Sequence, residues 1–298
     1  MQKLIVVTGA STGMGASTAR ELARQGFHVL AGVRRDHDAD AIRTAGIEPV
    51  ILDITSSEQV AALAARVAAL AARVAALAAR VAADPRTLHA LVNNAGIQVN
   101  APVEALPMAQ WRRVFEVNLF GHVAVTQALL PALLHDKGRV INISSIGGKA
   151  AMPTYGAYAG AKFALEAVSD SLRREVAPLG VPVVVVEPGG VRTKMAARGI
   201  ATANQLAAEM TPEQDARYGS LVQTINTLMQ TGTASGVTAD AAARVVAKAV
   251  TARRPRTRYT IGRDAALVIG LTRLLSDRML DRVIAANLRR HHPKAATG

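Results

Sequence analysis

The chain contains 298 residues, of which 50% are apolar and none is cysteine, and it carries a formal net charge of +13. This composition can bury a large core, and it excludes a disordered protein, a disulfide-bonded scaffold and a cysteine-ligated zinc site. The N-terminal apolar segment is too short for a signal sequence, and we find no apolar run approaching ~20 residues, so we expect a cytoplasmic protein without a membrane span.

Short apolar segments alternate with helical segments as far as about residue 190. Runs of β-branched and apolar residues are typical of buried strands, and the stretches between them repeat apolar residues at helical spacing. We therefore predict an α/β protein with a doubly wound parallel sheet (Rossmann-like) in a single domain, residues 1–263, with helices on both faces. The predicted strands are residues 4–8, 27–33, 48–54, 90–96, 138–145 and 181–190.

A glycine-rich turn, TGASTGMG at Thr8–Gly15, joins the first predicted strand to the first predicted helix. Gly9, Gly13 and Gly15 would let the backbone approach a pyrophosphate closely, and the following helix N-terminus favours its negative charge. The spacing differs from GxGxxG, and glycines also serve ordinary tight turns. The position of the turn directly after the first strand nevertheless favours dinucleotide binding.

The second predicted strand ends at Val33 and is followed by Arg34 and Arg35. At this position an NAD-binding protein usually has an acidic residue that binds the adenosine ribose, whereas Arg suits a 2′-phosphate. Two guanidinium groups can bind a phosphate through charge-assisted hydrogen bonds, although two solvated surface arginines would give the same sequence. We therefore predict NADP(H) as the cofactor.

Residues 61–81 contain the heptad AALAARV three times. Two of these copies are extra residues in the helix between the third and fourth strands, and as straight helix they would add about 21 Å. Because residues 84–87 cannot span that length, we predict an extended helix with a break in the tract, unwinding near residues 82–89, or a protruding loop. Its Val–Leu seam could pair with another helix, but the absence of charged partners beside the Arg residues favours a tolerated duplication.

Ser145, Tyr158 and Lys162 are the candidate catalytic residues. Tyr158 and Lys162 are four residues apart on a predicted helix, so they share one face. A free Tyr has a pKa near ~10, and a nearby ammonium group would lower that pKa so that the phenol could act as an acid or base near neutral pH. Ser145, at the end of the preceding strand, could donate a hydrogen bond to a substrate oxygen.

Beyond Met195 the alternation of strands and helices becomes weaker. Residues 195–240 are polar and rich in Thr, and they fit a lid over a ligand and an ordinary surface excursion equally well. Arg273–Arg290 has the pattern of one amphipathic helix within a basic helical extension, residues 264–298, and we expect it to pack on the body rather than on a membrane.

Residues 251–298 carry eleven Arg or Lys and three Asp. A basic segment of this kind can bind nucleic acid, but the chain has few aromatic residues and no nucleic-acid motif. We therefore interpret it as a solvated basic end and predict no nucleic-acid partner. The seven His residues show no metal-ligand spacing, so we predict no metal site.

Taken together, these motifs resemble those of the short-chain dehydrogenase/reductase family over about residues 1–195. The resemblance implies that Tyr158 is the general acid/base and that Lys162 lowers its pKa and binds the nicotinamide ribose. It further implies that Ser145 positions the substrate oxygen and that Asn118 holds a water molecule in a proton relay. The motifs are TGASTGMG, NNAG at Asn93–Gly96, Asn118 in VNLFG, Ser145, YAGAK at Tyr158–Lys162 and PGGVRT at Pro188–Thr193.

The resemblance also implies a set of cofactor-binding residues and a choice between two tyrosines. The family spacing favours Tyr158 over Tyr155 as the catalytic residue, which leaves Tyr155 as a substrate-cleft residue or a packing residue. The implied cofactor-binding residues are Gly9, Ser11, Thr12, Gly13, Met14, Gly15, Arg34, Arg35, Asp53, Ile54, Asn94, Ala95, Gly96, Tyr158, Lys162, Pro188, Gly189, Val191 and Thr193.

The activity implied by the resemblance is hydride transfer between a nicotinamide and a secondary alcohol or ketone. The C-terminal sequence is most similar to members acting on hydrophobic substrates such as steroids, retinoids or lipids, and a homo-oligomer (a dimer or tetramer) is expected. The alternative is a non-catalytic cofactor-sensing or scaffold protein that uses the repeat helix or the basic tail for a partner. The intact Ser–Tyr–Lys set argues against this alternative, because a binding module does not need it.

Overall fold

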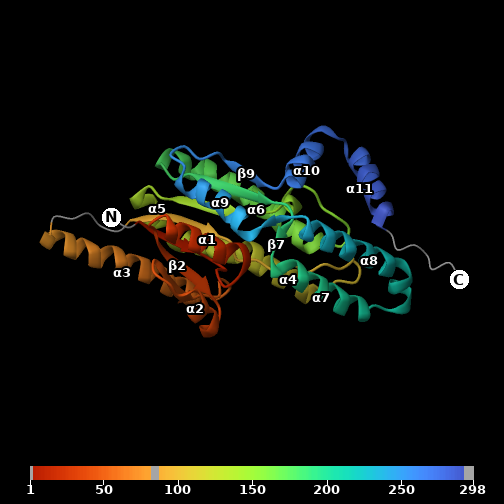
Figure 1. Cartoon of the computed structure of the whole chain (residues 1–298), viewed down its shortest axis with the longest axis horizontal. Helices are drawn as coiled ribbons and strands as arrows, with labels where there is room; N and C mark the ends of the chain where they lie inside the picture. The colour runs from red at the N-terminus through yellow and green to blue at the C-terminus, as the bar shows by residue number, and fades with distance from the viewer. Residues whose placement is uncertain (1–2, 82–86, 292–298) are drawn as a thin grey trace.

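The computed structural model describes residues 3–81 and 87–291, and within them a seven-stranded parallel sheet with the order β3–β2–β1–β4–β5–β6–β9 (Figure 1). The first six strands in the sequence overlap the predicted segments, although β3 and β4 begin one and two residues earlier than predicted, whereas β9 was not predicted. A separate pair, β7 and β8, joins two short segments near the carboxyl end of β6. The strands are β1 (Leu4–Val7), β2 (His28–Val33), β3 (Ile47–Ile51), β4 (Leu88–Asn93), β5 (Arg139–Ile143), β6 (Val183–Pro188), β7 (Val191–Arg192), β8 (Val237–Thr238) and β9 (Arg258–Ile261).

Helices cover both faces of the sheet, as predicted for a Rossmann-like fold. Alternate residues of β1 show why: Ile5 and Val7 pack in the core with α1 and α9, and Leu4 and Val6 pack in the core with α3 and α5. The helices are α1 (Gly13–Arg24), α2 (Asp36–Ile42), α3 (Ser57–Val81), α4 (Met108–Phe115), α5 (Gly121–Asp136), α6 (Gly156–Val176), α7 (Lys194–Ala208), α8 (Pro212–Ala234), α9 (Ala239–Thr251), α10 (Arg263–Leu274) and α11 (Asp277–His291).

The strand order reverses beside β1, which pairs with β2 on one side and with β4 on the other. The crossover helices of the two halves therefore leave β1 in opposite directions, and a crevice forms at the carboxyl ends of the central strands. The predicted glycine-rich turn follows β1 at this point. The fold thus places the turn, the end of β4 and the end of β5 around one crevice.

The heptad tract lies in one unbroken helix, α3, which spans Ser57–Val81. The predicted extended helix is therefore confirmed, and of the three alternatives for accommodating it, a break inside the tract is wrong. The return of the chain, where unwinding was the second alternative, falls largely in residues 82–86, outside the described part. Val60, Leu63 and Val67 are buried against the sheet, so the first part of the Val–Leu seam belongs to the core. In Figure 1 the C-terminal end of α3 extends beyond the sheet.

A continuous helical stretch, Met108–Asp136, is long and apolar enough by composition to cross a membrane. The expectation that no apolar run approaches this length is wrong, because residues 117–135 contain no Asp, Glu, Lys or Arg. Buried helices of water-soluble proteins pass the same test, and here Val125, Leu129 and Leu133 pack in the core with the sheet. A π-helical segment, η1 (Glu116–Phe120), separates α4 from α5 inside this stretch.

One segment near the C-terminal end differs from its prediction. Arg273–Arg290 is not one helix, because the chain leaves the helical conformation at Leu275 between α10 and α11. No residue of α11 is buried, although it contacts α8, and Met279 and Val283 are exposed. Residues 195–240 form mainly the helices α7 and α8, which contact each other beside the crevice.

Candidate active site

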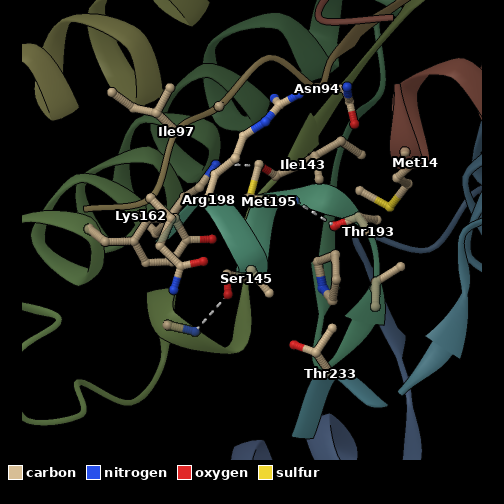
Figure 2. Close-up of a pocket in the computed structure, with 18 of the residues that line it drawn as sticks. Met14, Asn94, Ile97, Ile143, Ser145, Lys162, Thr193, Met195, Arg198 and Thr233 are labelled. Atoms are coloured by element: carbon tan, nitrogen blue, oxygen red, sulfur yellow. Dashed lines mark hydrogen bonds between the residues drawn. The ribbon is translucent and has the colours of Figure 1, made fainter. Parts of the chain in front are cut away.

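The crevice at the carboxyl ends of the strands contains a cavity of about 510 Å³. Figure 2 shows residues from the α1 turn, the β4 and β5 ends, α6 and α7 around it. The predicted site residues that line it are Gly9, Ser11, Thr12, Gly13, Met14, Gly15, Arg34, Asp53, Ile54, Asn94, Ala95, Gly96, Ser145, Tyr158, Lys162, Pro188, Gly189, Val191 and Thr193.

The glycine-rich turn adopts a conformation that other residues would not tolerate. Gly9 and Gly13 have φ values of 65° and 58°, in the left-handed region. A Cβ atom on Gly15 would lie 2.4 Å from the carbonyl oxygen of Gly9, so the turn could not close with any side chain there. No side chain caps the N-terminus of α1, and its first residues line the cavity. Their backbone amides are therefore suited to bind a phosphate group.

A buried threonine fixes the turn after β4 against the end of β1. The Thr8 hydroxyl accepts hydrogen bonds from the backbone amides of Asn94 (3.0 Å) and Ala95 (3.1 Å). The side-chain amide of Asn94 donates to the carbonyl oxygens of Thr8 and Gly9. These bonds hold the two walls of the crevice at a fixed separation. Sequence analysis missed Thr8 as a positioning residue, because its bonds join segments far apart in the chain.

Arg34 and Arg35 have different positions although they are adjacent. Arg34 lines the cavity, whereas Arg35 is outside it and occupies the N-cap position of α2. Both side chains are exposed, and within the described residues no carboxylate forms an ion pair with Arg34. After the carboxyl end of the neighbouring strand β3, the Asp53 carboxylate accepts hydrogen bonds from the backbone amide and hydroxyl of Thr55. Of the two predicted phosphate ligands, only Arg34 therefore faces the cavity.

Ser145, Tyr158 and Lys162 meet at the end of β5. Ser145 follows the strand and caps a short turn, η2 (Ile146–Gly148), by accepting a hydrogen bond from the Gly147 amide at 3.0 Å. Tyr158 and Lys162 lie on one face of α6, and the Lys162 ammonium group donates to the carbonyl oxygen of Ile143 at 2.8 Å. All three residues of the predicted set line the same cavity.

Burial controls the protonation of this group. It raises the pKa of the Tyr158 phenol, and a hydrogen bond with Ser145 opposes the shift. It lowers the pKa of Lys162 to about 8, which the Glu166 carboxylate opposes. The expected net lowering of the Tyr158 pKa is therefore not found in the free protein, because loss of solvation outweighs the hydrogen bond with Ser145.

Asn118 lies beside the cavity and does not line it. Its side chain is buried in η1, where it accepts a hydrogen bond from the Ile97 amide at 2.9 Å and donates to the Ile97 carbonyl at 2.8 Å. Nearby, His122 is fully buried, and burial lowers the pKa of His122 to about 3. The neutral imidazole is hydrogen-bonded to the carbonyl oxygen of Ala95 at 2.7 Å, so it supports the backbone of the β4 turn.

Apart from Tyr155, the remaining wall of the cavity comes from residues that the sequence analysis did not assign to the site. Most are apolar side chains, which look the same in the sequence as ordinary core residues. Met152 and Met195 line the cavity, whereas Met210, an equally apolar candidate for such a cleft, does not. The other lining residues include Ile97, Gln98, Tyr155, Arg198, Ile225, Leu228, Met229, Thr233, Asp264, Val268 and Asn287.

Comparisons with known proteins agree with this architecture. The chain matches the family model described as short chain dehydrogenase over residues 3–204. It is 34% identical to the uncharacterized oxidoreductase YbbO of Escherichia coli (strain K12), covering 95% of this chain and 94% of that protein. It is 35% identical to retinol dehydrogenase 7 of Mus musculus (89% and 82% covered) and 29% identical to the NADPH-dependent 3-dehydrocapnine reductase of Ornithobacterium rhinotracheale (96% and 97% covered).

Solved structures show the same fold. A short chain dehydrogenase from Burkholderia cenocepacia in complex with NADP superposes with a TM-score of 0.68 at 26% identity, covering 95% of this chain and 98% of that one. A short chain dehydrogenase/reductase from Burkholderia phymatum in complex with NAD has a TM-score of 0.71 at 24% identity, covering 95% of each chain, and this likeness concerns the fold alone. The two neighbours therefore differ in the cofactor that they contain.

Proposed function

The chain belongs to the short-chain dehydrogenase family, and we propose that it is an NADP(H)-dependent oxidoreductase acting on a hydrophobic secondary alcohol or ketone. The observation that carries this proposal is the meeting of Ser145, Tyr158 and Lys162 in a cavity that also contains the glycine-rich turn. A nicotinamide cofactor of this family supplies or accepts a hydride at the reacting carbon. The side chains then have to hold the substrate oxygen and exchange one proton with it.

Tyr158 is the group suited to that proton transfer. In reduction, its phenol would donate the proton to the carbonyl oxygen, and in oxidation its phenolate would accept the proton of the hydroxyl. The Ser145 hydroxyl would donate a second hydrogen bond to the same oxygen and so stabilise the charge that develops on it. Lys162 would keep a positive charge beside the phenolate in the steps where that anion forms.

The residues around the cavity fit a dinucleotide. The amides at the start of α1 suit the pyrophosphate, as Gly9, Gly13 and Gly15 leave no side chain between them and the cavity. Asp53 and Ile54 lie where an adenosine would bind, and Pro188–Thr193 where the nicotinamide would lie. Arg34 supports NADP(H) over NAD(H), because it places a positive charge at the end of β2. Among the described residues this charge has no carboxylate partner.

Apolar side chains support a hydrophobic substrate. Ile225, Leu228 and Met229 of α8 form a wall of the cavity, and Met152 and Met195 lie on other elements around it. One relative carries the name retinol dehydrogenase 7, which is consistent with such a substrate.

The surface of α6 has exposed apolar residues, Phe163 and Val168, and the exposed Phe120 lies on η1, which contacts α6. We propose this surface as the contact of a homo-oligomer.

The cofactor preference can be tested by titrating NADPH and NADH into the protein in a calorimeter. We expect NADPH to bind more tightly than NADH, and Arg34→Ala to weaken NADPH binding by about 10- to 100-fold, the usual loss for a charge-assisted hydrogen bond. NADH binding should change by less than about twofold, because NADH has no 2′-phosphate. Arg35→Ala is the matched control, since Arg35 lies outside the cavity. Equal binding of the two cofactors, or equal effects of the two variants, would contradict the NADP(H) assignment.

A further inference from the structure

Three polar side chains converge on the sulfur atom of one methionine beside the cavity. The Tyr155 hydroxyl donates to the Met229 Sδ atom at 3.1 Å, the Gln98 side-chain amide at 3.3 Å, and the Asn100 side-chain amide at 3.5 Å. Gln98 and Tyr155 line the cavity together with Met229, and Asn100 lies behind them with 1% of its surface exposed. The three donors come from the β4–α4 connection and from the residue before α6.

At the sulfur atom this arrangement pairs strong donors with a weak acceptor, while the Gln98 and Asn100 side chains also hydrogen-bond to Tyr155. A thioether sulfur accepts hydrogen bonds poorly, and Met229 is itself almost buried, with 9% of its surface exposed. The Asn100 Oδ1 atom is also buried without a hydrogen-bond partner among the described residues. Poorly satisfied polar groups reduce the stability of a protein, so each one in a folded protein calls for an explanation, such as a catalytic role or a bound water or ligand.

The cluster lies next to the catalytic tyrosine. The rings of Tyr155 and Tyr158 meet edge to face, with their centroids 6.2 Å apart. Burial beside Tyr158 raises the pKa of Tyr155 to about 12, so its hydroxyl remains a neutral donor over the whole physiological range. A substrate whose reacting oxygen is held by Tyr158 and Ser145 would therefore extend past Tyr155 and Gln98 before it reaches the apolar wall of α8.

We propose that Gln98 and Tyr155, supported by Asn100, form a polar subsite for a second oxygen atom of the substrate, separate from the oxygen at the reacting carbon. The substrate class is then an otherwise apolar ketone or alcohol with an additional hydroxyl, carbonyl or ether oxygen a few bonds away. Met229 has a flexible side chain, so it can move aside when that oxygen accepts the hydrogen bonds. This inference rests on the proposed function for the position of the reacting carbon.

Binding measurements test the subsite independently of turnover. Long-chain 2-ketones, each with and without a hydroxyl group at successive positions along the chain, are titrated into the protein saturated with NADP⁺. We expect one hydroxyl position to raise the affinity about tenfold, the effect of one well-formed hydrogen bond. In Tyr155→Phe, which retains the ring, and in Gln98→Leu, this preference should fall to within about twofold.

Tyr218→Phe serves as the matched control, because Tyr218 does not line the cavity and its hydroxyl hydrogen-bonds to Glu104. The preference for the hydroxylated ketone should persist in it. The subsite is overturned if no hydroxyl position raises the affinity, or if Tyr155→Phe and Gln98→Leu keep the preference. Reduction of the same ketones with NADPH is measured separately. Absence of turnover with the preference intact would count against the proposed function and leave the subsite standing.

Discussion

Tyr158 is the residue on which the proposed chemistry depends most directly. Replacing it with Phe removes the proton donor and keeps the ring in its packing position, so we expect kcat/KM to fall by about 10²–10⁴-fold. NADPH affinity should stay within about twofold of wild type, because the phosphate and adenosine contacts are far from the phenol. Steady-state kinetics and calorimetry measure the two effects, with Tyr218→Phe as the control. Full turnover in Tyr158→Phe would exclude Tyr158 as the acid/base.

Lys162 makes the stability of the free protein depend on pH. Its pKa in the folded state is about 8, below the value of 10.5 for a solvated lysine side chain. Between these two pH values the unfolded chain therefore binds more protons than the folded one. Raising the pH through this window therefore stabilises the folded state. Relative to Lys162→Met, which has no charge to bury, the free energy of unfolding of the wild type should rise by about 1–2 kcal/mol between roughly pH 7.5 and 9.5.

Urea denaturation of the cofactor-free protein at several pH values measures this difference. The comparison with the variant is required because the whole chain has an isoelectric point near 10.9, and its net charge also decreases over the same range. If wild type and Lys162→Met show the same slope, the ammonium group is not desolvated in the folded state. In that case the Lys162 contact with Ile143 would not reflect a buried charge.

At the scale of helices and strands, the sequence predicted those elements whose signals are local. β1, β4 and β5 are runs of apolar residues, and α6 carries Tyr158 and Lys162 at helical spacing. β9 was missed because only Ile261 in it is buried, and its side chains are fixed by distant partners. Arg258 of β9 pairs with Glu166 and Asp170 of α6 at 3.0 Å, and with Glu187 of β6 at 3.3 Å.

In the site, too, the sequence predicted the residues whose signals are local. Glycines and hydroxyl residues at strand ends carry a chemical signal, so the cofactor side and the Ser–Tyr–Lys set could be named from the sequence. The cavity wall formed by α8, α10 and α11 could not be named from the sequence, because apolar residues such as Leu228 and Val268 carry no chemical signal of a site. Arg35 shows the limit of spacing, because it lies at the N-cap of α2 and outside the cavity. The Asn118 side chain bonds to the Ile97 backbone beside the cavity, and its role in a proton relay stays a prediction.

In the whole molecule, the C-terminal end of the heptad tract projects away from the helices α7, α8, α10 and α11, which carry residues of the cavity wall (Figure 1). Figure 1 shows the C-terminal end of α3 at one end and α7, α8, α10 and α11 at the other. Within the described residues, the tract contacts the body through Leu63, Ala64 and Val67, and through an ion pair between Arg66 and Glu48. These contacts need only one heptad.

Deleting residues 61–74 tests this separation of roles. In the shortened chain Leu77 and Val81 would take the core positions of Leu63 and Val67, and Arg80 would take the place of Arg66 beside Glu48, because the repeats are identical. We therefore expect the free energy of unfolding to change by less than about 0.5 kcal/mol, as for surface changes, and NADPH affinity to be unaltered. The molar mass in solution, measured by light scattering, should fall only by the mass of the deleted residues. Dissociation into smaller assemblies would instead identify the projecting helix as a contact between subunits, and a loss of several kcal/mol would place the later heptads in the core.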